Sequence, residues 1–170
     1  MKKAFISLML TIVSAIVLNA QSLTGKPWYT VFTDEDGTDI VVSYTFEDNG
    51  TCELVIATEY EMKEDDVPIL LTGGVTVPGT FSLKGDDLKV NLNKRKAEVE
   101  LDYEIKGMDP EVKKLMDKEI GAEIKGLRKE FKDEMLNGLP KTQTMKVVSL
   151  DKNELVLRDE EGDEIPFYSE

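Results

Sequence analysis

Short runs of alternating apolar and polar residues, separated by turn residues, constrain this chain more than any other feature. In the run 40–47, the apolar residues that share one parity are Ile40, Val42, Tyr44 and Phe46. Successive side chains of a strand point to opposite faces of a sheet, so this alternation predicts strands with one buried and one wetted face. Comparable runs are 28–33, 52–56, 80–84, 88–92, 96–106, 142–150, 154–158 and 165–168.

Tight turns join most of these runs and suggest how they are arranged. Asn49-Gly50 is a strong hairpin signal, because both residues tolerate positive φ. Sequential hairpins with one buried face favour an antiparallel meander, and a large twisted sheet usually closes because closure removes its edges. We therefore expect a mainly β fold: an antiparallel up-and-down β-barrel of about eight to ten strands. The segment 67–78 contains Pro68, Gly73-Gly74 and Pro78, which predicts an edge, a bend or a rim.

One long α-helix is predicted as an insertion between strands, at residues 109–138. Asp109 suits the N-cap, Pro110 the first helical position, and Asn137-Gly138 the stop. Two internal glycines leave a bend or two shorter helices open. The apolar stripe comprises Val112, Leu115, Met116, Ile120, Ile124, Leu127, Phe131 and Met135. That stripe can pack on the chain's own barrel, act as a lid over its mouth, or form an interface with a protein partner.

The first twenty residues have the layout of a secretory signal peptide. A basic start at residues 1–3 leads into an apolar run at 4–18, and a small residue precedes the expected cut between Ala20 and Gln21. The run is short for a membrane span, which needs about 20 residues, so we expect cleavage and no stable membrane anchor. Cys52 lies far from the cut, which excludes acylation of a new N-terminal cysteine. The expectation is a bacterial-style exported protein, periplasmic or extracellular, with one domain at 21–170.

The charge balance argues against polyanionic partners. Removing Lys2 and Lys3 from the 21 basic residues leaves 19 against 34 acidic residues, a net charge of −15. Binding to nucleic acid or to anionic lipid relies on clusters of Lys and Arg. We therefore expect no nucleic-acid partner. We interpret the acidity as a source of solubility, with attraction of a cationic ligand as the alternative.

The chain has no histidine and a single cysteine. Without histidine there is no Ser-His or Cys-His nucleophile and no usual zinc or copper ligand. Cys52 shares parity with Leu54 and Ile56, which indicates a buried apolar residue rather than a reactive thiol. No cofactor is expected.

Carboxylates are the remaining candidates for chemistry. Asp34, Asp36 and Asp39 surround Gly37 at short spacing, but they miss the calcium-loop pattern and indicate a turn. Residues 159–164 likewise indicate a solvated hairpin tip. Carboxylate pairs for a hydrolase arise by chance among 34 acidic residues. We therefore predict no catalytic residue, no metal ligand and no enzyme activity, with a carboxylate-based hydrolase as a third and minor alternative.

Four motifs together resemble those of lipocalin-like (calycin-type) barrels, and the resemblance spans most of the mature chain. They are Gly25-Lys26-Pro27-Trp28, Phe-x-x-x-Gly at 46–50, Gly-Thr-Phe-Ser-Leu with Asp-Leu-Lys-Val at 79–90, and Asn-Glu-Leu-Val-Leu-Arg at 153–158. The resemblance implies a barrel that holds a small ligand. It also implies that a late arginine, here Arg158, covers Trp28 by cation–π attraction.

Four inward aromatic residues are the candidate ligand contacts: Tyr44, Phe46, Phe81 and Tyr103. They either line a cavity or fill the barrel as ordinary core. The leading hypothesis is an exported, non-catalytic barrel that binds a small, partly apolar ligand. The alternative is a protein–protein interaction module, an assembly factor or inhibitor, whose barrel interior is solid and whose helix 109–138 meets the partner.

Overall fold

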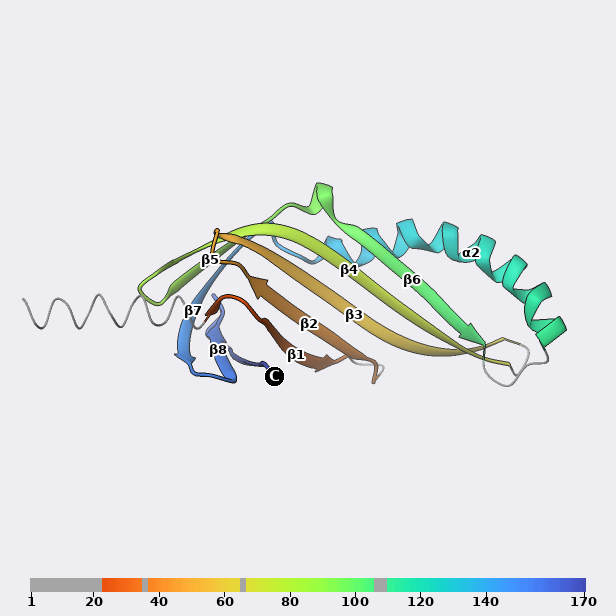
Figure 1. Cartoon of the computed structure of the whole chain (residues 1–170), viewed down its shortest axis with the longest axis horizontal. Coiled ribbons are helices and arrows are strands. Elements are labelled where there is room, and N and C mark those ends of the chain that lie inside the picture. Colours follow the sequence, from red (N-terminus) through yellow and green to blue (C-terminus); the bar gives the residue numbers. More distant parts are fainter. Residues whose placement is uncertain (1–22, 35–36, 65–66, 106–109) are drawn as a thin grey trace, which may run out of the picture.

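The computed structural model describes residues 23–34, 37–64, 67–105 and 110–170 (Figure 1). Within them lie nine strands, one long helix and one short 3₁₀ helix. In chain order these are β1 (Pro27–Thr33), β2 (Asp39–Phe46), β3 (Thr51–Glu64), β4 (Val67–Lys84), β5 (Asp87–Leu92), η1 (Lys94–Lys96), β6 (Glu98–Ile105), α2 (Pro110–Asn137), β7 (Thr142–Leu150), β8 (Glu154–Arg158) and β9 (Glu164–Tyr168).

Eight of the strands form a closed antiparallel ring. Its order is β1-β2-β3-β4-β5-β7-β8-β9, and β9 pairs back with β1. Every neighbour in the ring is the next ring strand along the chain, which confirms the predicted up-and-down barrel. β6 lies outside the ring and pairs only with β4.

One end of the ring, which we call the closed end, is solid. It carries the turns at 47–50, 85–86 and 151–153, while the opposite end, the mouth, carries the turns at 34–38 and 159–163. The ring of Trp28 is fully buried at the closed end, and its Nε1 donates to the carbonyl oxygen of buried Leu23 at 2.8 Å. Fully buried neighbours in the same core are Phe46, Leu54, Leu88, Val90, Leu155 and Leu157.

Residues 67–78, predicted as an edge, a bend or a rim, belong instead to one continuous strand of 18 residues. β4 pairs with β3 from Val67 to Thr80, while its other edge pairs first with β6 and then with β5. Pro78 lies where that edge passes from β6 to β5. Its carbonyl oxygen accepts from Asn93 N at 2.8 Å on the β5 side. The N–H and C=O of a strand residue point to the same side of the strand, so the nitrogen of Pro78 also faces the β5–β6 fork. The N–H that proline lacks is therefore not one that would bond to β3.

The helix α2 covers the part of the sheet that extends beyond the barrel (Figure 1). It is one continuous helix, in agreement with the predicted insertion. A Cβ at Gly73 would lie 2.5 Å from Cζ of Phe131. The lack of a side chain at Gly73 therefore makes room for the Phe131 ring, and this glycine does not mark the predicted bend. Gly73 shares parity with buried Val75 and Val77, so α2 lies on the continuation of the barrel's inner face.

Cationic side chains of α2 also cover the free edge of β6. Arg128 Nη2 donates to the carbonyl oxygen of Leu101 at 3.2 Å, and Lys132 Nζ donates to that of Ala97. Unpaired edge carbonyls invite pairing with another chain, so these bonds protect β6. Of the predicted stripe, Ile124 is buried whereas Leu127 is 44% exposed. The side chains of Val112, Leu115, Met116 and Ile120 lie outside the described part.

Among the described residues, no helix combines the length and the apolar character needed to cross a membrane. The predicted signal peptide lies outside the described residues.

Candidate ligand-binding cavity

A cavity of about 430 Å³ occupies the mouth half of the barrel. Tyr44 and Phe167, which line it, contact each other edge to face, and the Phe46 ring stacks on Tyr44. The apolar walls of the cavity come from strands on both sides of the ring. The inner side chains that line it are Phe32, Val42, Tyr44, Leu54, Ile56, Gln143, Met145, Ile165 and Phe167.

A hydrogen-bonded pair is set into these walls. Tyr44 Oη donates to Oε1 of Gln143, and the Tyr44 ring stacks on Phe46 with centroids 5.7 Å apart and meets the edge of Phe167 at 5.8 Å. Burial raises the pKa of Tyr44 to about 12, although the bond to Gln143 pulls it down and Cys52 adds slightly to the rise. The phenol is therefore neutral at physiological pH. The amide NH₂ of Gln143 makes no hydrogen bond to another described residue and keeps its donor capacity.

Acidic residues form one side of the rim. Asp159, Glu160 and Glu161, in the turn between β8 and β9, line the cavity. Asp159 Oδ1 accepts the N–H groups of Glu161, Gly162 and Asp163 at 3.0, 2.8 and 2.9 Å, which orders the turn. Carboxylate oxygens of Asp159, Glu161 and Asp163 lie within 4.8 Å of one another. The hairpin tip predicted at 159–164 is present.

The cavity lies at the seam of the ring that has the fewest paired residues. β1 and β9 pair only at Tyr29 and Tyr168, near the closed end. Continuing that register would place Pro166 opposite Val31, and proline has no N–H to donate. Phe32 and Ile165, one from each side of this seam, both line the cavity.

Comparisons with known proteins give distant structural likenesses. No protein-family model and no curated protein sequence matches the chain. Among solved structures, a lipocalin-like protein from Bacteroides uniformis ATCC 8492 is 21% identical, with a TM-score of 0.43, over 86% of this chain and 97% of that chain. The fold class follows from the ring itself, with eight antiparallel strands in chain order around a cavity. The protein is an eight-stranded up-and-down β-barrel, the architecture also found in lipocalins.

The barrel places the four predicted ligand contacts in different environments. Tyr44 lines the cavity. Phe46 and Phe81 pack edge to face, with centroids 4.9 Å apart, in the core below it. Tyr103 lies on β6, outside the ring, with its hydroxyl 4.0 Å from where a Cβ on Gly121 would lie. The alternation in β6 is genuine, but β5 occupies the ring position beside β4.

Gln143, Met145, Ile165 and Phe167 line the cavity but were not singled out from the sequence. Their strands were predicted, and their parity within 142–150 and 165–168 was the available signal. The run 142–150 contains no aromatic residue, and Phe167 in the run 165–168 was not counted among the inward aromatic residues. Ligand contact by any of these cavity residues stays a prediction.

Trp28 and Arg158 do not meet as the resemblance implied. Lys26 Nζ lies 4.1 Å from the centroid of the Trp28 ring, and Arg158 pairs instead with Glu164. The reason is parity: Leu155 and Leu157 point into the barrel, so Arg158 points outward.

The turn predicted around Gly37 is also present. Asp34 Oδ1 accepts the N–H of Thr38 at 2.8 Å, and Asp39 Oδ1 accepts the hydroxyl of Thr33 at 2.7 Å. Asp36 lies outside the described residues.

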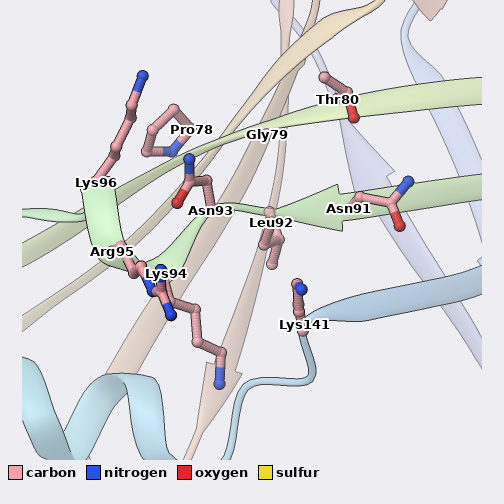
Figure 2. Close-up of a pocket in the computed structure, with 10 residues that line it drawn as sticks. All are labelled: Pro78, Gly79, Thr80, Asn91, Leu92, Asn93, Lys94, Arg95, Lys96 and Lys141. Atoms are coloured by element: carbon pink, nitrogen blue, oxygen red, sulfur yellow. The ribbon is translucent and has the colours of Figure 1, made fainter.

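A larger hollow, of about 800 Å³, lies on the outside of the barrel at the β5–β6 fork (Figure 2). It contains Lys94, Arg95, Lys96 and Lys141. Figure 2 shows Lys94 and Lys96 extending in opposite directions from η1. Lys94 Nζ donates to the carbonyl oxygen of Leu136 at 2.8 Å, which ties η1 to the end of α2. The cations therefore do not converge on one ligand position.

Proposed function

We propose that this lipocalin-like barrel binds a small, partly apolar molecule in its mouth cavity and performs no chemistry on it. The observation that carries the proposal is the cavity of about 430 Å³, which lies within the range of small-molecule sites. Its walls are apolar, and the Tyr44–Gln143 pair supplies a few fixed polar groups that can orient a ligand.

The solid interior expected of an interaction module is present in only half of the barrel. Core side chains fill the closed end, whereas the mouth half is hollow. The helix uses Ile124, Phe131 and Met135 against its own sheet and core. These observations favour a ligand over a protein partner that docks on the apolar stripe of α2.

Export is part of the proposal and rests on the signal-peptide layout of residues 1–20. Expression of the full chain in a bacterial host, followed by fractionation and mass measurement, tests it. We expect a mature protein that begins at Gln21, in the periplasm or medium. An uncleaved chain that stays in the cytoplasm would contradict export.

Native mass spectrometry of the mature protein, purified from its own host, tests binding. We expect an added small-molecule mass that is lost on denaturation. A Met145→Trp variant should lose that mass because the indole fills the cavity. Val148→Trp, on the exposed outer side of the same strand, should retain it. An apo mass for the parent protein, with no uptake from a lipid panel, would favour the interaction module.

A further inference from the structure

The charged residues around the cavity indicate which charge a ligand would carry. Among its lining residues, all within the described part of the chain, there is no lysine or arginine, whereas Asp159, Glu160 and Glu161 stand at the mouth. Arg158, the single cation on the β8–β9 hairpin, pairs with Glu164. Among the described residues, Asp159, Glu160 and Glu161 therefore form no ion pair with a lysine or arginine.

The apolar part of a ligand has a defined place below that rim. Leu54, Ile56 and Met145 present hydrocarbon and thioether surface, and burial of such surface is favourable. A carboxylate head group would stand beside the acidic rim without a compensating cation. A cationic head group would be attracted to it, since a low-dielectric wall strengthens the field of nearby charges.

We infer that the cavity takes an amphiphile whose apolar chain lies between β2, β3 and β7 and whose ammonium-type head group lies at the Asp159–Glu161 rim. This inference rests on the proposed ligand-binding function. It narrows the ligand class to cationic amphiphiles and excludes fatty-acid carboxylates as preferred ligands.

Three probes with one chain length test the head group: decylammonium, decanol and decanoate. Each is titrated calorimetrically into the mature protein at about pH 7 and low salt, below its micelle-forming concentration. We expect decylammonium to bind about tenfold more tightly than decanoate, with decanol between them. Added salt should reduce this difference, because the rim is solvent-accessible.

Matched variants separate the rim from the general acidity of the protein. Glu160→Gln/Glu161→Gln should weaken decylammonium binding about three- to tenfold and leave decanol binding unchanged. Glu59→Gln/Glu61→Gln removes the same charge from exposed positions of β3 that share no parity with the cavity-lining Leu54 and Ile56, and should have little effect.

Three results would overturn the inference. Equal or tighter binding of decanoate would refute the cationic head group and leave the proposed function standing. Equal weakening by both variant pairs would assign the preference to overall charge. If none of the three probes binds, the proposed function loses its support together with the inference.

Discussion

Tyr44 shows how a polar group is held inside an apolar wall. Its ring is fixed by Phe46 and Phe167, and its hydroxyl by Gln143. Burial favours the neutral phenol, so the pKa rises from 10.0 to about 12 in the folded protein. The unfolded chain loses the phenol proton near the ordinary pKa of tyrosine, whereas the folded protein keeps it to a higher pH.

Stability should therefore depend on Tyr44 at alkaline pH. Its contribution is fully present below pH 10 and is lost as pH rises towards 12, by up to about 2–3 kcal/mol. Urea unfolding of the parent and of Tyr44→Phe across this range measures it. The parent should lose stability relative to the variant as pH rises, since the variant has no phenol to ionise. Curves that stay parallel would contradict the shift.

Single residues were predictable where parity alone decides their environment. Cys52 is buried, as predicted from its neighbours Leu54 and Ile56, and burial raises the pKa of its thiol to about 11. The partner of Trp28 was not predictable in the same way. Lys26 reaches the ring from two residues away, whereas Arg158 had to be brought in by the resemblance.

At the scale of elements, the packing of the Phe131 ring on Gly73 joins α2 to β4. The phenyl ring occupies the space that a side chain on β4 would need. Gly74, the next residue, has only Ile56 O near its Cβ position, at 3.9 Å. Adjacent glycines of one strand therefore have different roles.

This difference gives a matched pair of substitutions. Gly73→Ala should destabilise the protein by about 1–3 kcal/mol, because the new methyl group overlaps the Phe131 ring. Gly74→Ala should be neutral or slightly stabilising, since its Cβ would meet only Ile56 O, at an ordinary van der Waals distance of 3.9 Å, and strand glycine is costly. Chemical unfolding measures both. Adding Phe131→Leu to Gly73→Ala should recover part of the lost stability. Equal effects of Gly73→Ala and Gly74→Ala would contradict the packing of Phe131 on Gly73.

Local signals predicted the helix well and failed for β4. Asp109-Pro110 and Asn137-Gly138 act on their own neighbourhood, so the observed bounds of Pro110 and Asn137 nearly match the prediction. The tolerance of β4 for Gly73 and Pro78 depends on α2 and on the β5–β6 fork, which are contributed by other segments. Contacts with segments distant in the chain cannot be detected in a short window of sequence.

For the whole molecule, the alternation predicted closure but not which strands close. β6 has as clear an alternation as any ring strand, yet β5 takes the place beside β4 through a two-residue turn. The mouth cavity likewise depends on how eight strands share one interior. Sequence parity selected inward residues without showing that half of the interior stays hollow.

The β1–β9 seam should be the least stable junction of the ring. Hydrogen–deuterium exchange followed by NMR should show faster exchange for seam-facing amides at 30–33 and 164–167 than for amides shared by β2 and β3. The seam has one register pair, whereas β2 and β3 are paired over the whole of Ile40–Phe46. Exchange that begins between β2 and β3 would contradict this order.

The pairing of Tyr29 with Tyr168 brings the first and last strands of the ring together at the closed end. Ser169 N donates to Asn153 O in a turn of that same end, at 3.0 Å. A tether, a tag or a solid support joined to the C-terminus would therefore hold the barrel with its mouth directed away from the attachment point. The molecule can be immobilised without obstructing the approach to its cavity, as a capture reagent or sensor requires.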